Sequence, residues 1–273
     1  MNTPANTSKP ASQPEPELRA PESENTLATL AMPLGESVLT LTAGSAPVYG
    51  ILHRSRAMTS QSDFFRLQFR GFARIEGSQW QHYANDDARF HVAYNCAWVR
   101  VDHPSRSVTF GPKNGINCTE GFHNLGLDTF LFAQTISWVK GIYPDYAISP
   151  GLIAITGNAS EEEKLRRNAF YASQGFQFDW QDAGQRTGLF FKDKINRLLG
   201  VWDKDHIQEV GGEAMLQSLA MQDESRVALE DKVSRLEAAN STMKSALQKE
   251  RNTSQILMGV LIVGVMLALW AVI

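Results

Sequence analysis

Segments that alternate apolar and polar residues fill much of the chain between residues 36 and 111. In a β-strand successive side chains point to opposite faces, so this alternation predicts strands that have one buried face. The stretch FFRLQFRGF, which begins at Phe64, alternates apolar and basic positions in this way. We expect strands over residues 37–42, 64–75, 90–101 and 107–111.

Apolar residues at helical spacing appear later in the chain. Residues 127–139 carry apolar side chains three and four positions apart, which predicts a helix. A second helix is expected to begin after Ser160, where Glu163 completes a capping box, and to end at Gly175. Further strands are expected over residues 151–156, 176–180 and 188–195. This order of strands and helices is typical of an α+β (mixed α/β) fold.

The chain beyond Gly211 contains no proline and carries a heptad pattern. Its core positions alternate steps of four and three, with an asparagine at one a position: Leu229, Val233, Leu236, Asn240, Met243 and Leu247. Lys232 and Glu237 fall at a g position and the following e position, which suits an ion pair between parallel helices. We expect a coiled-coil stalk over residues 204–252 that forms a homodimer. The alternative is a lone amphipathic helix.

Residues 256–273 read ILMGVLIVGVMLALWAVI, without a charged or strongly polar side chain. An apolar run of about 18 residues is a candidate for a membrane-spanning helix. We therefore expect a transmembrane helix over residues 253–273 with membrane lipid as its partner; a buried core helix is the alternative. Lys244, Lys249 and Arg251 precede the run, and positive charge favours the cytoplasmic side. The pattern predicts a single-pass C-terminal anchor with the N-terminal domain in the cytoplasm.

The first 35 residues have the composition of a disordered arm. They contain many prolines among Ser, Thr, Asn and Glu, and they have few apolar side chains. Such a segment cannot bury enough surface to offset the conformational entropy that ordering costs. We expect residues 1–35 to be disordered, with a docking motif as the alternative, and residues 36–203 to form one globular domain.

Charge and cysteine content narrow the classes of partner. The net charge is -3 and the pI is near 6.1, whereas nucleic-acid binding needs a concentrated basic surface. No nucleic-acid partner is therefore expected. Cys96 and Cys118 lie apart in the sequence, and the six histidines form no recognised ligand pair. No metal site is expected either.

The stretch EEEKLRRNAFYASQGFQFDW, residues 161–180, is the most specific motif in the chain. It resembles the penultimate helix and following strand of the GNAT superfamily of N-acetyltransferases, whose members often carry a basic helix that ends in FY, three further residues and GF. Here these positions are Phe170, Tyr171, Gly175 and Phe176. The order of expected elements after residue 90 also fits. The resemblance implies a GNAT-like central sheet flanked by helices, and acetyl-CoA or another acyl-CoA as cofactor.

The resemblance also assigns roles to individual residues. In the family, a tyrosine at the position of Tyr171 often protonates the departing thiolate of coenzyme A. Tyr171 is therefore the candidate catalytic acid, and a core tyrosine with a hydrogen-bonded hydroxyl is the alternative. The family binds a pyrophosphate at a Q/R-x-x-G-x-G/A turn before a helix, because the backbone N–H groups there are free. That turn falls on Gly121, Asn124 and Gly126, and with Leu127 these are the candidate cofactor-binding residues.

Acetyl transfer also needs a group that takes a proton from the attacking amine. Family members commonly use Glu, Asp or His, sometimes through water, and such a base works best when its pKa is near the working pH. Asp102, His103 and Glu120 lie near the ends of expected strands. We take Glu120 and Asp102 as the candidate catalytic bases, with ordinary surface charge as the alternative.

These sequence features lead to two candidate functions from different classes. The first is a membrane-anchored N-acyltransferase that uses acyl-CoA. The second is a non-catalytic, membrane-tethered scaffold in which a GNAT-like head and coiled-coil dimerisation bind a protein partner. The segment from Gly121 to Gly126 separates them, because Gly121 replaces the motif's Gln or Arg and Asn124 replaces its first glycine. Binding of acyl-CoA decides between the two.

Overall fold

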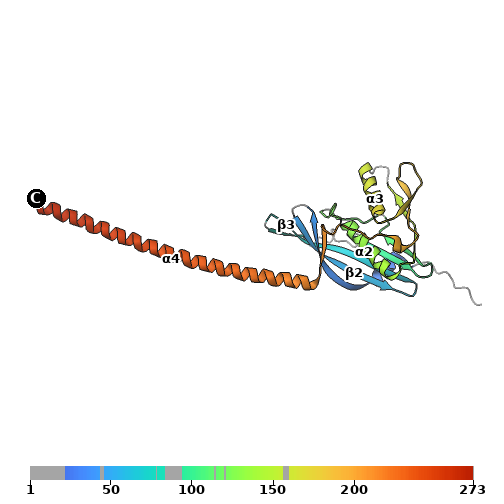
Figure 1. Ribbon diagram of the computed structural model, residues 1–273, viewed down its shortest axis with the longest axis horizontal. Helices are drawn as coiled ribbons and strands as arrows, with labels where there is room; N and C mark the ends of the chain where they lie inside the picture. Colours follow the sequence, from blue (N-terminus) through green and yellow to red (C-terminus); the bar gives the residue numbers. More distant parts are fainter. Residues whose placement is uncertain are drawn as a thin grey trace, which may run out of the picture. The chain divides into compact units, whose positions relative to one another are not determined.

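The computed structural model describes residues 22–43, 46–77, 79–83, 94–113, 115–119, 121–155 and 160–272. The side chains of residues 43, 46 and 268–272 are not described. The chain divides into two units between Val210 and Gly211. Within the described residues, the first unit contains two sheets and three α-helices, and the second is one long helix (Figure 1).

A large sheet organises the first unit, and over the described residues it has eight strands. They lie in the order β11-β1-β2-β3-β5-β6-β7, and β4 also pairs with β3. Neighbouring strands are antiparallel except β6 and β7, which are parallel. The bounds are β1 Met32–Ala43, β2 Ala46–Met58, β3 Ser62–Glu76, β4 Gln79–His82, β5 Cys96–Asp102, β6 Ser107–Gly111, β7 Ala147–Ile148 and β11 Ile207–Val210.

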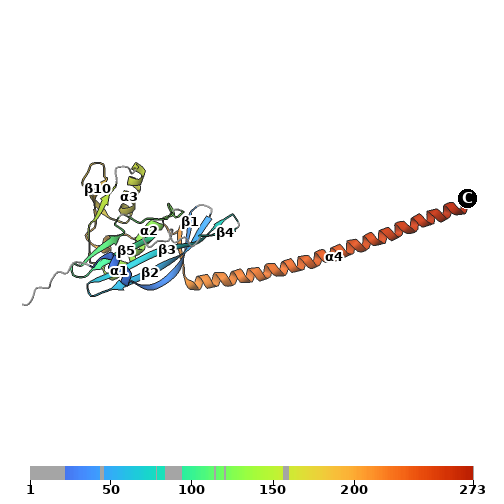
Figure 2. The same cartoon turned by 180° about the vertical axis from the view of Figure 1, so that it is seen from behind.

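Helices cover both faces of this sheet where β3 begins. Helix α2, Leu127–Ile142, packs against β3 and β5 on one face (Figure 1). Its Trp138 stacks on Phe65, with ring centroids 4.6 Å apart. Phe64 points to the opposite face, because neighbouring side chains of a strand alternate. There it packs with Leu27 of the short helix α1, Glu24–Leu30, which Figure 2 shows beside β2.

A smaller antiparallel sheet completes the first unit. Its strands lie in the order β8-β10-β9, with bounds Gly151–Ala154, Thr187–Phe191 and Gln177–Trp180. Helix α3, Glu161–Ser173, lies between β8 and β9 in the chain, and a 3-10 helix, Ile195–Arg197, follows β10. The chain therefore leaves the large sheet after β7 and enters the small one at β8.

The predicted α+β class is confirmed, with a central mixed sheet and flanking helices. The strand expected over residues 107–111 coincides with β6, and the helix expected over residues 127–139 lies within α2. The capping box is also confirmed. The Ser160 hydroxyl accepts a hydrogen bond from the backbone N–H of Glu163, and the Glu163 carboxylate accepts one from the N–H of Ser160.

The predicted extent of the disordered arm, residues 1–35, differs from the structure. Helix α1 begins at Glu24, and the hydroxyl of Ser23 caps it by accepting a hydrogen bond from the backbone N–H of Thr26. Leu27 is fully buried against Ala57 and Phe64. This burial offsets the entropy of ordering, and the composition of the segment does not reveal it. Residues 1–21 lie outside the described residues.

The sequence pattern also fails to predict β2, which is a central strand of the large sheet. Polar residues interrupt its apolar pattern, and their partners come from other strands. The Arg54 guanidinium, for example, donates hydrogen bonds to Ser37 of β1 and to Glu209 of β11. Of the strand expected over residues 90–101, residues 90–93 lie outside the described residues, and β5 begins at Cys96.

The second unit is helix α4, Gly212–Val272. Among the described residues, no helix is both long enough and apolar enough to cross a membrane. This finding overturns the predicted transmembrane helix over residues 253–273, and with it the single-pass C-terminal anchor that would leave the N-terminal domain in the cytoplasm.

Candidate functional site

A cavity lies where the large and small sheets diverge. Strands β6 and β7 pair in parallel at Val108 and Ile148, and the N–H of Ser149 donates a hydrogen bond to the carbonyl of Val108 at 2.8 Å. Pro150 then follows, which has no N–H to continue the ladder, and β8 pairs with β10 instead. A crevice of this kind, beyond the carboxyl end of a parallel strand, is a common ligand-binding position.

The cavity has a volume of about 380 Å³, within the range of small-molecule sites. Aromatic and aliphatic side chains form much of its wall, and hydroxyl groups and two cationic side chains complete it. The lining residues are Thr109, Phe110, Pro112, Lys113, Phe132, Ser149, Pro150, Gly151, Leu152, Ile153, Ala154, Arg167, Tyr171 and Phe190. Such a wall suits a ligand with an extended apolar arm and an anionic end.

Tyr171 lies in this wall on the last turn of α3. Its ring stacks on Phe190 of β10, with ring centroids 4.1 Å apart, and meets the edges of Phe132 and Phe176. The side chain is 5% exposed. Burial raises the pKa of the Tyr171 hydroxyl, and the nearby Arg167 charge opposes this shift. The phenol is therefore neutral at physiological pH and can donate its proton.

The two cationic residues lie on different elements. Lys113 lies two residues after the end of β6, and its ammonium lies 3.7 Å from the carboxylate of Glu24 in α1. Arg167 lies four residues before Tyr171, so both side chains are on the same face of α3. The Arg167 guanidinium lies beside Gly115. A β-carbon placed on Gly115 would be 3.5 Å from Nη2 of Arg167. Arg167 therefore reaches from α3 to the segment that follows β6.

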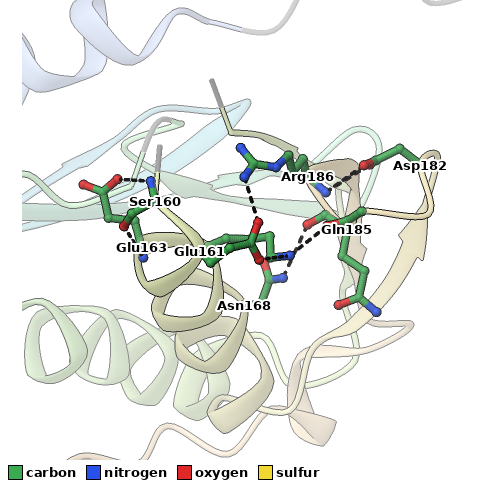
Figure 3. A network of polar contacts seen from close by, with 9 residues as sticks. Ser160, Glu161, Glu163, Asn168, Asp182, Gln185 and Arg186 are labelled. Atoms are coloured by element: carbon green, nitrogen blue, oxygen red, sulfur yellow. Dashed lines mark hydrogen bonds and ion pairs between the residues drawn. The ribbon is translucent and has the colours of Figure 1, made fainter. Parts of the chain in front are cut away.

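Polar contacts hold the start of α3 against the turn between β9 and β10 (Figure 3). The Glu161 carboxylate pairs with Lys164 at 2.6 Å and with Arg186 of that turn at 2.8 Å. The hydrogen bond from Lys164, followed by the one from Arg186, lowers the pKa of Glu161. The Lys164 ammonium also donates to the carbonyl of Gly184 at 3.1 Å. These contacts fix the helix that carries Tyr171.

The turn between β9 and β10 is itself ordered by one carboxylate. Asp182 accepts a hydrogen bond from the backbone N–H of Arg186 (Figure 3). It also accepts one from the backbone N–H of Thr187, at 2.6 Å. The bond from Thr187 contributes most to lowering the pKa of Asp182. At the other end of α3, Gly175 has a φ of +90°, a conformation that glycine adopts without strain. The backbone then places Phe176 in the core beside Tyr171.

The structure does not bring the predicted catalytic bases to the cavity. Asp102 lies at the end of β5, where its carboxylate accepts a hydrogen bond from the Ser105 hydroxyl at 2.7 Å, and it is not among the lining residues. Glu120 lies outside the described residues. No catalytic base is therefore placed by the geometry of the described residues.

The predicted cofactor-binding residues build the start of α2 and do not line the cavity. Gly121 and Gly126 have positive φ angles of +96° and +74°, and Gly126 is the N-cap residue of α2. Asn124, which also has positive φ, accepts a hydrogen bond from Arg166 of α3 at 3.1 Å. Leu127 is fully buried in the core. The segment thus connects α2 to α3.

The sequence analysis thus names Tyr171, which lines the cavity, but it does not name the two cationic lining residues, Lys113 and Arg167. Two signals could have found them. Pro112 and Lys113 directly follow a strand, at the edge where ligands commonly bind, and Arg167 precedes Tyr171 by one helical turn. Among the described residues, no group of three or more His, Cys, Asp or Glu side chains is arranged to hold a metal ion.

Comparisons with known proteins do not assign the chain to a family. No protein-family model matches the sequence, and neither a curated protein nor a solved structure matches it.

Proposed function

We propose that the first unit is a GNAT-like domain that binds acyl-CoA and transfers its acyl group to an amine. One observation carries the proposal: the crossover β6-α2-β7 leaves a cavity at the end of β6, and Tyr171 of the FY-x-x-x-GF motif lies in its wall. The motif and the cavity are independent features of the chain. Both point to the same residue.

The lining residues fit the chemical parts of an acyl-CoA. Phe110, Phe132 and Phe190 provide apolar surface for the acyl and pantetheine arm. Lys113 and Arg167 provide the positive charge that phosphate groups need, and arginine binds phosphate through paired hydrogen bonds. The phosphates would thus be held by these two cations and not by the predicted turn at Gly121 to Gly126.

The strand edge adds a further binding group. The backbone carbonyl of Val108 faces β7, where it accepts a hydrogen bond from the N–H of Ser149. The backbone N–H and carbonyl groups of every second residue in a strand face the same side, so those of Phe110 also face the side of β7. Those groups lie beyond the last hydrogen bond to β7, on the side where the cavity opens. They can bind the amide groups of the pantetheine arm as an added strand would.

In the proposed reaction, the amine nitrogen attacks the thioester carbonyl carbon and forms the new C–N bond. The C–S bond then breaks, and the departing thiolate takes a proton from the Tyr171 hydroxyl. The amine loses one proton to water, and Tyr171 recovers its own from water. The products are an amide and the free thiol. Positioning of the amine beside the thioester supplies much of the acceleration.

Calorimetry of the full chain with acetyl-CoA tests the proposal. We expect a Kd tighter than about 1 mM, and Lys113→Ala or Arg167→Ala should each weaken it about tenfold, since each removes a charge-assisted hydrogen bond. Lys194→Ala is the matched control, because Lys194 pairs with Asp145 away from the cavity. Absence of binding at millimolar acetyl-CoA would exclude the enzyme.

One observation favours the second candidate function, a non-catalytic head that binds a protein partner. The segment from Gly121 to Leu127 is used to start α2 and to contact α3, and it does not line the cavity. A domain that uses this segment to hold its helices in place does not need a bound cofactor to keep its fold. The calorimetry separates the two, because this candidate requires no affinity for acetyl-CoA.

A further inference from the structure

Helix α4 presents an apolar stripe to solvent. The five apolar residues at its heptad core positions are all strongly exposed, with values from 53% at Val233 to 67% at Met243. Leu229 and Val233 lie on the open surface of the helix between Ser218 and Glu237. An exposed stripe of this kind on a long helix requires a partner, because water contact with apolar surface is unfavourable.

The residues at the core positions specify what the partner is. A β-branched residue, Val233, occupies an a position, and leucines occupy the d positions before and after it at Leu229 and Leu236. This combination favours two parallel strands. Asn240, at the next a position, can hydrogen-bond to the same asparagine of a second copy, and this pairing fixes the register. A partner with a different sequence would leave Asn240 unmatched.

The charges along α4 agree with self-pairing. Arg235 pairs with Asp231 within the helix at 3.1 Å, and Arg226 pairs with Asp223 at 3.3 Å. Over the described residues, neither Lys232 nor Glu237 has an ion pair within its own helix. These two residues occupy a g position and the following e position. A parallel in-register dimer therefore places Lys232 of each copy beside Glu237 of the other copy, which allows two symmetric ion pairs.

We propose that residues 229–247 of α4 form a parallel, in-register coiled coil with a second copy of this chain. The surface is the stripe from Leu229 to Leu247, and the occupant is the identical stripe of the partner. This proposal is independent of the acyltransferase proposal, because it uses only residues of the second unit.

Disulfide trapping of the full chain tests the register. In a parallel in-register dimer the two copies of Leu236 meet, so Leu236→Cys should cross-link into dimers under mild oxidation. Ala238→Cys is the control, because it lies at an outward f position and carries the same native cysteines. Light scattering of the unmodified chain should give twice the chain mass of 30.3 kDa. A monomer, or equal cross-linking of the two variants, would overturn the proposal.

A charge exchange tests the g to e pairing separately. Lys232→Glu should weaken the dimer about fivefold, since it places like charges together at two symmetric positions. The double variant Lys232→Glu with Glu237→Lys restores opposite charges and should recover the dimer. If the double variant dimerises no better than the single variant, the parallel register is wrong. Far-UV circular dichroism checks that both variants keep their helix.

Discussion

The ring of Tyr171 stacks on that of Phe190, with the ring centroids 4.1 Å apart and the planes 20° from parallel. This contact joins the last turn of α3 to the central strand of the small sheet. It fixes the position of the Tyr171 ring in the cavity wall, while the capping box and the turn at Asp182 fix the start of the helix. The candidate acid is therefore held by packing as well as by hydrogen bonds.

Removing the hydroxyl of Tyr171 should reduce turnover without altering affinity. Tyr171→Phe keeps the stacked ring but removes the proton donor, and loss of a general acid typically costs about 10²-fold in rate. The measurement is release of free thiol from acetyl-CoA with an amine acceptor, beside calorimetry of acetyl-CoA binding. Tyr146→Phe is the control, since Tyr146 does not line the cavity. A rate equal to that of the unmodified chain would exclude the proposed role.

The ion pair between Arg56 and Asp63 should contribute strongly to the stability of the folded chain. The Asp63 carboxylate is fully buried, and it accepts hydrogen bonds from Arg56 at 2.9 and 2.6 Å and from the Tyr143 hydroxyl at 2.8 Å. Arg56→Ala leaves this buried charge short of its counter-ion, which costs about 3 kcal/mol. Urea unfolding measures the loss. Arg74→Ala, which breaks an exposed pair with Glu76, should cost below about 1 kcal/mol.

Stability should fall at alkaline pH because of Tyr143. Burial, followed by the hydrogen bond to Asp63, raises the pKa of Tyr143 to about 12. An unfolded tyrosine titrates near 10, so between about pH 10 and 12 the folded state holds more protons than the unfolded state, and stability falls as pH rises. Tyr143→Phe lacks this group and should show a shallower fall in the same window. An equal fall in the free energy of unfolding between about pH 10 and 12 for the variant and the unmodified chain would contradict the prediction.

The N-terminal cap of α3 should contribute to the stability of the small sheet region. Ser160→Ala removes the hydroxyl that accepts from the N–H of Glu163, and loss of such a cap costs about 1 kcal/mol. The midpoint of urea unfolding should therefore decrease. Ser173→Ala, at the other end of the helix, removes only a hydroxyl that bonds the carbonyl of Phe170 and should have a smaller effect. An effect of equal size would argue against the capping contribution.

Some elements are fixed locally and were predictable for that reason. The helix from Glu161 follows from Ser160 and Glu163, which form hydrogen bonds within one turn, and it stops at Gly175, whose positive φ the glycine allows. Strand β6 follows from a two-residue alternation that needs one buried face. The sequence also indicates Tyr171, because its position is set by that same helix end.

Other features depend on contacts between distant parts of the chain. Helix α1 becomes ordered because Leu27 is buried against β2 and β3, and β2 is stabilised where Arg54 and Arg56 bind residues of other strands. Lys113 and Arg167 share a cavity only because the fold brings residues of α3 and residues that follow β6 to the same place. The apolar run from residue 256 led to the overturned membrane anchor, since local hydropathy was its only basis.

The sequence by itself thus determined the local conformations of the chain: the alternation of strands, the caps of α3 and the heptads of α4. Only the tertiary structure decided which polar side chains are buried and which residues meet at the cavity. The physical reason is that capping and periodicity involve neighbours within a few residues. Burial and convergence at a site depend on pairings such as Val108 with Ile148, which are 40 residues apart in the chain.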